Sequence, residues 1–180
     1  MKWKTENADC TICNNSTLHT IFKKNSFEYV KCDNCSLVFA SPRLKMEEIN
    51  KIYSIGFEGK LEKKEGESDQ SKYYPLIKTF EKFRNNNRIL DIGCFNGIFL
   101  KGAKDLKWEV YGTEISSDVI EHAIENTNGG DIKCGELEDI NYPDDYFDVI
   151  VLLDVIEHLP DPYKTVKEIN RILRPGGLLY

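Results

Sequence analysis

The heptapeptide DIGCFNG, residues 91–97, places an acid and two glycines directly after the apolar residues Ile89 and Leu90. A glycine-rich turn between a strand and a helix lets the backbone approach a bound nucleotide closely. A dinucleotide site also requires glycine at position 95, because the pyrophosphate lies on the helix N-terminus. Phe95 therefore favours a cofactor that has no phosphate and lies across the turn by a ribose and an amino-acid end.

A second acid, Glu114, ends the next apolar stretch, WEVYGTE. An acidic side chain at this strand end accepts hydrogen bonds from ribose hydroxyls. Asp91 suits the same ligand, because a carboxylate attracts an ammonium group and repels a pyrophosphate. Helix capping or solvation in a loop is the alternative explanation for both acids. Their agreement favours a ligand that contains a nucleoside.

Four of the six cysteines form two Cys-x2-Cys pairs that are separated by 18 residues. This spacing is typical of a zinc ion held by four thiolates, and a segment this short has too little core to fold without such a staple. Two disulfides are the alternative, which an intracellular location would disfavour. We expect a closed, structural zinc site made by Cys10, Cys13, Cys32 and Cys35.

The remaining cysteines and two of the three histidines are expected to have no chemical role. Cys94 and Cys134 are unpaired in the sequence and are interpreted as small buried thiols. His19 and His122 are interpreted as ordinary polar residues. His158 differs, because it follows the strongly apolar stretch FDVIVLL, and histidine is well suited to be a general base at neutral pH.

These residues need strands and helices to position them. From residue 88 onward, apolar strands alternate with helices, which predicts a doubly wound, mostly parallel α/β sheet with its ligand at the carboxyl ends of the strands. The expected strands are 88–93, 108–114, 131–135, 147–153 and 177–180, and the expected helices are near 97–106, 117–127 and 161–173.

Composition changes twice along the chain and predicts three parts. Residues 1–42 are expected to form a small zinc ribbon with strands at 27–32 and 36–42. The α/β domain is expected to occupy 88–180. Between these lies a helical and charged linker region, 43–87, with a helix at 44–53, a mobile stretch at 56–72 and a second helix at 73–84.

The net charge of −6 is unevenly distributed along the 180 residues. Residues 1–87 carry 15 Lys and Arg against 12 Asp and Glu, whereas residues 88–180 carry 9 against 18. An acidic surface repels phosphate backbones, which argues against a nucleic-acid substrate. The sequence shows neither a signal peptide nor an apolar run long enough to span a membrane, so we expect a cytoplasmic protein.

Four stretches in order resemble the class I S-adenosylmethionine-dependent methyltransferases: ILDIGCFNGIFL, VYGTEIS, CGELEDINYPDDYFDVIVLLDVIEHLPDP and INRILRPGGLLY. The resemblance covers about residues 88–180 and implies a Rossmann-like methyltransferase fold with S-adenosyl-L-methionine as cofactor. It implies that the methionine end is bound by Asp91, Gly93 and Gly97, the ribose by Glu114, and the adenine by Ile115, Glu136 and Leu137, with Glu138 and Asp139 as alternatives to Glu136.

The N-terminal part resembles the zinc-binding leader of bacterial methyltransferases that modify sugars and other small molecules. Asn14 and Ser36 stand where glycine commonly follows each cysteine pair, and asparagine tolerates the left-handed conformation that such turns use. Similar folds close their sheet with two more strands. We therefore expect the chain to stop inside its fifth strand and to lack part of the acceptor pocket.

The resemblance implies methyl transfer to a small-molecule acceptor such as a nucleotide-linked sugar or a glycan precursor. His158 is the expected general base and Glu157 its partner, although the pair could instead only shape its loop. An RNA methyltransferase that grips RNA with its zinc ribbon is one alternative function. A non-catalytic module that binds the cofactor is another.

Overall fold

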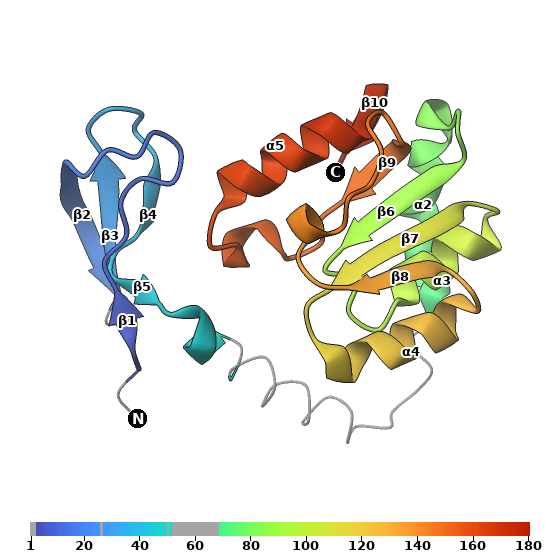
Figure 1. Ribbon diagram of the computed structural model, residues 1–180, viewed down its shortest axis with the longest axis horizontal. Helices are drawn as coiled ribbons and strands as arrows, with labels where there is room; N and C mark the ends of the chain where they lie inside the picture. The colour runs from blue at the N-terminus through green and yellow to red at the C-terminus, as the bar shows by residue number, and fades with distance from the viewer. Residues whose placement is uncertain (1–2, 26, 50, 52–68) are drawn as a thin grey trace. The chain divides into compact units, whose positions relative to one another are not determined.

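The computed structural model describes residues 3–25, 27–49, 51 and 69–180. The chain divides into two compact units, Met1–Glu65 and Gly66–Tyr180. Figure 1 shows the short strands of the first unit and the larger sheet of the second. Within the described ranges, no helix is both long and apolar enough to cross a membrane.

The first unit is built from short antiparallel strands. One sheet has the order β2-β3-β4, with β2 at Leu18–Lys24, β3 at Phe27–Cys32 and β4 at Val38–Ala40; β1 (Thr5–Glu6) pairs separately with β5 (Arg43–Leu44). Among its described apolar side chains, only Cys10, Val30 and Cys32 are buried, and Trp3 is 42% exposed. So small an apolar core is consistent with a unit that needs a metal ion or another cross-link to stay folded.

Two sequence predictions for the linker region 43–87 need correction. The helix predicted for 44–53 begins only at residue 46, because Leu44 belongs to β5 and pairs with Thr5. Residues 50 and 52–53 of that helix lie outside the described residues, as do residues 56–68 of the predicted mobile stretch. The end of that stretch is helical: Gln70–Tyr73 form the 3-10 helix η1, whose first turn is capped by the Asp69 carboxylate.

The second unit contains a parallel sheet in the order β10-β9-β6-β7-β8, which confirms the predicted fold class. Neighbouring residues of its central strand β6 face opposite sides, so that Ile89 packs in one apolar core and Leu90 in the other. The strands are β6 (Arg88–Ile92), β7 (Glu109–Glu114), β8 (Asp131–Cys134), β9 (Phe147–Val151) and β10 (Leu173–Leu179).

Helices cover both faces of this sheet, as Figure 1 shows. The core on one face includes Phe99 and Leu100 of α3, and the core on the other includes Ile169 and Ile172 of α5. The first face carries α2 (Tyr74–Thr79), α3 (Ile98–Asp105) and α4 (Ser117–Thr127), and the second carries α5 (Pro162–Ile172).

Two elements of the second unit differ in detail from the prediction. The helix predicted for 73–84 is divided into the end of η1, α2 and the 3-10 helix η2 (Phe80–Phe83). The last strand was expected at 177–180 but begins at Leu173, which pairs with Phe147 directly after α5. The intervening Pro-Gly-Gly is accommodated by a register shift between Leu173 and Leu178.

A buried carboxylate joins the start of β9 to two other segments. Asp148 is fully buried, and its oxygens accept hydrogen bonds from the backbone N–H groups of Asn85, Asn86 and Asn87 at 2.7–3.0 Å. It also accepts from the Arg174 guanidinium at the beginning of β10. Burial raises the pKa of the Asp148 carboxyl, but these donors outweigh burial and hold the pKa below its usual range.

Candidate functional site

The predicted cofactor acids lie at the carboxyl ends of two adjacent strands. Asp91 is near the end of β6 and Glu114 is the last residue of β7. The backbone N–H of Phe95 donates to Glu114 Oε2 at 3.0 Å, and the N–H of Ser116 donates to Oε1 at 2.9 Å. Glu114 therefore ties the glycine-rich turn after β6 to the end of β7.

Asp91 combines burial with an unsatisfied polar atom. Its side chain is 3% exposed, and within the described residues its Oδ1 atom has no hydrogen-bond partner. Burial, and next the charge of Glu114, raise the pKa of the Asp91 carboxyl well above its usual value. A buried carboxyl oxygen without a partner is costly, and a ligand that carries a positive charge and N–H donors would satisfy it.

The two glycines of the turn have different neighbours. Both have positive φ, +70° at Gly93 and +73° at Gly97. A β-carbon on Gly93 would lie 2.6 Å from a methyl group of Val155, so the loop after β9 packs directly on the turn. A β-carbon on Gly97 would lie 3.0 Å from the backbone of Ala123, so the close approach at Gly97 is made by α4.

The residues predicted to contact adenine lie on two neighbouring loops. The N–H of Gly135 donates to the Glu114 carbonyl at 2.9 Å, which places the loop after β8 beside the end of β7. Ile115 is 51% exposed and Glu136 is exposed, whereas Leu137 is 3% exposed and packs in the core. Of the two alternative acids, Glu138 accepts the Thr165 hydroxyl at 2.6 Å and Asp139 is exposed.

The predicted catalytic pair lies on the loop that follows β9. Glu157 and His158 belong to the 3-10 helix η4 (Ile156–His158), and both are exposed. The His158 N–H donates to the Val155 carbonyl at 2.9 Å, and Val155 packs on Gly93. The structure thus brings the His158 loop against the glycine-rich turn.

Phe95 has a conformation that the sequence did not reveal. Its φ is +51°, and its side chain is 37% exposed. The sequence does contain one signal of this positive φ, because Phe95 stands at a turn position where a glycine is expected. Cys94 beside it is buried, as predicted, and burial raises the pKa of its thiol. Cys134 was predicted to be buried but is exposed, because it ends the edge strand β8.

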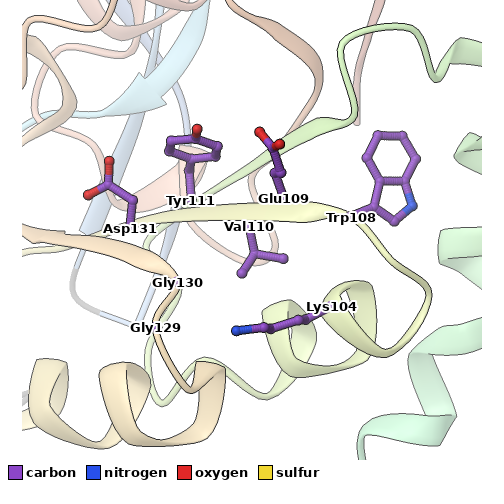
Figure 2. Close-up of a pocket in the computed structure, with 8 residues that line it drawn as sticks. All are labelled: Lys104, Trp108, Glu109, Val110, Tyr111, Gly129, Gly130 and Asp131. Atoms are coloured by element: carbon purple, nitrogen blue, oxygen red, sulfur yellow. The ribbon is translucent and has the colours of Figure 1, made fainter.

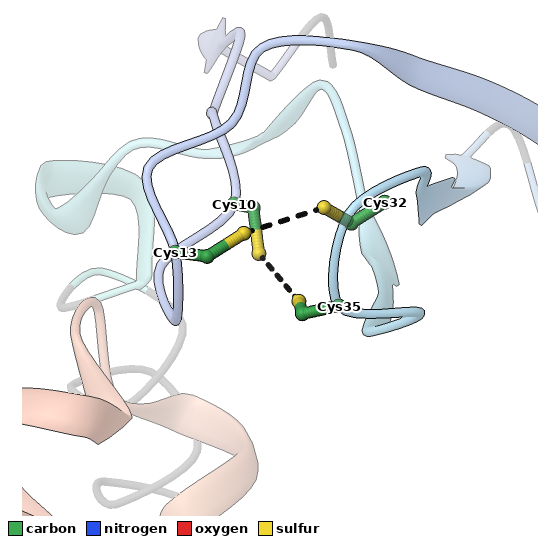
Figure 3. A group of neighbouring side chains, drawn as sticks. All are labelled: Cys10, Cys13, Cys32 and Cys35. Atoms are coloured by element: carbon green, nitrogen blue, oxygen red, sulfur yellow. Dashed lines mark hydrogen bonds between the residues drawn. The ribbon is translucent and has the colours of Figure 1, made fainter.

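The four paired cysteines meet in the first unit, as Figure 3 shows. Their sulfur atoms all lie within 4.8 Å of one another, with 3.3 Å between Cys10 and Cys35 and 3.5 Å between Cys13 and Cys32. Sulfur atoms that hold one zinc ion tetrahedrally are about 3.8 Å apart, given a Zn–S distance of about 2.3 Å. The geometry and the donor atoms therefore fit a single zinc ion.

The turns around these cysteines also fit metal binding. Asn14 and Ser36 adopt left-handed φ values of 55° and 65°, and their N–H groups donate to the carbonyls of Cys10 and Cys32. A hydrogen bond from the backbone of Cys35 helps to lower the pKa of Cys32 to about 6, whereas hydrogen bonds with the other three cysteines outweigh one from the backbone of Leu37 and raise the pKa of Cys35. His19 lies outside the cluster and contacts Asp33, as expected for an ordinary polar residue.

A hollow of about 290 Å³ lies at the opposite, amino ends of β7 and β8 (Figure 2). Its charged groups already have partners: Lys104 donates to the carbonyl of Thr127, Glu109 pairs with Arg88, and Asp131 pairs with Lys133. It is therefore not the site that Asp91 and Glu114 define. The hollow is lined by Lys104, Trp108, Glu109, Val110, Tyr111, Gly129, Gly130 and Asp131.

A parallel sheet with a glycine-rich turn and an acid at each of two adjacent strand ends defines a Rossmann-like, nucleoside-binding domain. A sequence model of the family described as "Methyltransferase domain" matches residues 90–180. The chain belongs to this family, and S-adenosylmethionine is the cofactor that membership of the family supports.

Two curated relatives are methyltransferases of small-molecule pathways. The chain is 34% identical over 105 residues to 27-O-demethylrifamycin SV methyltransferase of Amycolatopsis mediterranei, a match that covers 53% of the chain. It is 35% identical over 97 residues to the ubiquinone biosynthesis O-methyltransferase of Parvibaculum lavamentivorans, with 52% of the chain covered. In both cases the match spans 38% of the relative's length.

Solved structures support the same fold. The PH0226 protein from Pyrococcus horikoshii is 30% identical, with a TM-score of 0.52 over 59% of this chain and 52% of that one. The S-adenosylmethionine-bound CalS10 of Micromonospora echinaspora, an amino pentose methyltransferase, has a TM-score of 0.56 over 71% of this chain and 54% of that one. At 21% identity, the second likeness shows the fold alone.

Proposed function

We propose that the chain binds S-adenosylmethionine and transfers its methyl group to a small-molecule acceptor. The observation that carries this proposal is the meeting of Asp91, Glu114 and the Val155–His158 loop at the carboxyl ends of adjacent strands. When bound, the cofactor supplies a methyl group on a positively charged sulfur. The chain itself has to bind the cofactor, orient the acceptor and remove a proton from it.

The two acids would hold the two ends of the cofactor. The unpartnered Oδ1 of Asp91 is suited to the ammonium group of the methionine end. Each Glu114 oxygen accepts one backbone N–H, and a carboxylate has about four lone-pair sites, so both oxygens can still accept a ribose hydroxyl. Exposed Ile115 would pack on the adenine, and exposed Glu136 would accept its amino group.

His158 would act as the general base, with Glu157 as its partner. Its loop packs on the cofactor turn through Val155, and its side chain is exposed to an incoming acceptor. The names of the two curated relatives favour a hydroxyl acceptor. One is named an O-methyltransferase, and the name of the other gives an O-demethylated compound as its substrate. A nucleotide-linked sugar or a glycan precursor remains our narrower prediction, which rests on the resemblance of the sequence motifs alone.

The first unit would hold one structural zinc ion through Cys10, Cys13, Cys32 and Cys35. Four thiolates close the coordination sphere, so the metal would bind no substrate. Its contribution would be to fold a unit whose described apolar core is very small.

Methyl transfer is tested by incubating the full chain with methyl-labelled S-adenosylmethionine and either a pool of small metabolites or total RNA. We expect label in the small-molecule fraction, where the labelled product identifies the acceptor. Glu114→Ala should abolish the labelling, whereas Glu121→Ala, an exposed acid on α4, should not.

Two other outcomes would contradict this function. Label in RNA, with binding that weakens steeply as salt increases, would indicate the RNA methyltransferase. Cofactor binding by calorimetry without transfer to any acceptor would indicate the non-catalytic module.

A further inference from the structure

Phe95 keeps a backbone conformation that is unfavourable for a residue with a side chain. Its φ of +51° lies in the left-handed region, which glycine adopts freely. Gly93 and Gly97 on the same turn have φ of +70° and +73°, so a third glycine would fit the turn with less strain. Residues held in such conformations cluster at functional sites, where the surrounding structure compensates for the strain.

The backbone of Phe95 does not explain why the residue is aromatic. Its N–H donates to Glu114 Oε2 at 3.0 Å and so helps to hold the acid proposed to bind ribose. Any residue other than proline supplies the same N–H. The reason for a phenylalanine must therefore lie in what its ring contacts.

Phe95 belongs to the turn along which a cation is expected to pass. Phe95 is 37% exposed, and its turn connects buried Asp91 to Glu114 through the N–H bond described above. In S-adenosylmethionine the sulfonium lies between the ammonium group and the ribose. A cofactor that reaches from Asp91 to Glu114 therefore carries its positive sulfur along this turn, and the face of an aromatic ring attracts a cation.

We propose that Phe95 is a specificity-determining residue of the cofactor site, whose ring favours the cationic sulfonium of S-adenosylmethionine over the neutral thioether of S-adenosylhomocysteine. This role rests on the proposed binding of the cofactor by Asp91 and Glu114. The strained residue then has a function in each catalytic cycle. Methyl transfer removes the positive charge that the ring attracts, so the protein binds the product S-adenosylhomocysteine more weakly than it binds the cofactor.

The test is calorimetric binding of both ligands to the full chain. Phe95→Leu keeps the β-carbon and the apolar bulk but removes the aromatic face. We expect it to weaken S-adenosylmethionine binding by about 2- to 30-fold, the range of a cation–π contact, and to leave S-adenosylhomocysteine binding unchanged within twofold. Phe95→Gly should lose the same discrimination while it raises the melting temperature of the ligand-free protein by relieving the backbone strain.

The outcomes separate this role from the proposed function. Equal weakening for the two ligands would mean that the ring acts by apolar contact alone and would overturn the proposal. Unchanged binding of both would mean that the ring contacts neither and would overturn it as well. Failure of the wild-type chain to bind either ligand would overturn the proposed function together with this role.

Discussion

At the scale of single residues, Asp91 shows how a binding site can conflict with stability. Its carboxyl is buried beside Glu114 and one of its oxygens has no partner within the described residues. Both features favour the neutral form in the ligand-free protein. A cationic ligand reverses this preference, because an ammonium group stabilises the carboxylate. Binding and ionisation at this residue are therefore linked.

We expect cofactor binding at neutral pH to release up to one proton, and Asp91→Asn to abolish the release. Calorimetry in two buffers with different ionisation enthalpies measures the protons exchanged. Glu114 and the Cys94 thiol are the other titratable groups that act on Asp91 or its neighbourhood. Asp91→Asn should also bind the cofactor more weakly, since the charge-assisted hydrogen bond is lost.

The same residue predicts how stability depends on pH. Above pH of about 4 an unfolded chain has lost the aspartate proton. Folded Asp91 keeps its proton up to a higher pH, so this residue lowers stability as pH rises, by up to about 1.4 kcal/mol per pH unit within that window. Urea unfolding from pH 4 to 7 should show this slope for the wild type relative to Asp91→Asn. Parallel curves would mean that Asp91 is ionised in the folded protein.

His158 carries the prediction about catalysis. If it is the general base, His158→Ala should reduce turnover by about 100- to 10,000-fold, the usual contribution of a positioned base. Cofactor affinity should stay the same, because the predicted cofactor contacts come from other loops. Initial rates with the identified acceptor, together with calorimetry for the cofactor, make the comparison.

The matched control is His122→Ala, which removes an exposed histidine on α4 that lies 3.9 Å from Glu125. This variant should keep wild-type turnover. If His158→Ala also keeps more than about a third of the activity, well short of the loss expected for a base, the enzyme works by aligning its substrates.

At the scale of elements, Asp148 shows the opposite behaviour of a buried acid. Its three backbone donors and Arg174 link the loop before β6 to β9 and β10. Removing one partner of a buried, hydrogen-bonded charge pair typically costs about 3–5 kcal/mol, because the other groups are left unsatisfied. We expect Asp148→Ala to lower the free energy of unfolding by about this amount in urea titrations.

The pH dependence at Asp148 has the opposite sign to that at Asp91. The pKa of Asp148 is lowered in the folded state. Its contribution to the free energy of unfolding is therefore complete above the pH at which an unfolded aspartate ionises, and this contribution is lost as pH falls through the folded pKa. The difference between wild type and Asp148→Ala should therefore shrink in acid. Asp139→Ala, an exposed acid, should show no comparable loss. A stability loss at neutral pH as small as that of Asp139→Ala would contradict the role of Asp148.

The strand ends and their acids could be predicted because they depend on local pattern. Apolar stretches followed by Asp91 and Glu114 indicate parallel strands, whose carboxyl ends meet at one edge. Other features depend on contacts between elements far apart in the chain. Gly97 packs on α4, the exposure of Cys134 follows from its place on an edge strand, and the strand at Leu173 depends on pairing with β9. Residue spacing contains none of this information.

At the scale of the whole molecule, the two units have separate apolar cores and should lose their structure separately. We expect one zinc per chain in protein purified without added metal, measured by elemental analysis. Cys32→Ser should lose the zinc and unfold the first unit, because structural zinc in small domains contributes about 10–16 kcal/mol of binding free energy. The second unit should keep its structure, which amide hydrogen exchange would resolve by segment.

Cys134→Ser is the matched control, because it removes an exposed thiol outside the cluster. This variant should retain its zinc. Purified wild-type protein with well under half an equivalent of metal and with oxidised cysteine pairs would contradict the zinc site.

The position of the two tryptophans lets a simple optical measurement tell unfolding of the second unit from unfolding of the first. Trp3 in the first unit is 42% exposed, whereas Trp108 in the second is 3% exposed and has the Arg84 guanidinium 4.6 Å from its ring centre. An indole in contact with water emits at longer wavelength than one enclosed in a protein, because mobile water dipoles relax around its excited state. A red shift of the fluorescence would therefore report the opening of the methyltransferase domain, while loss of the metal would leave the blue-shifted emission of Trp108 in place.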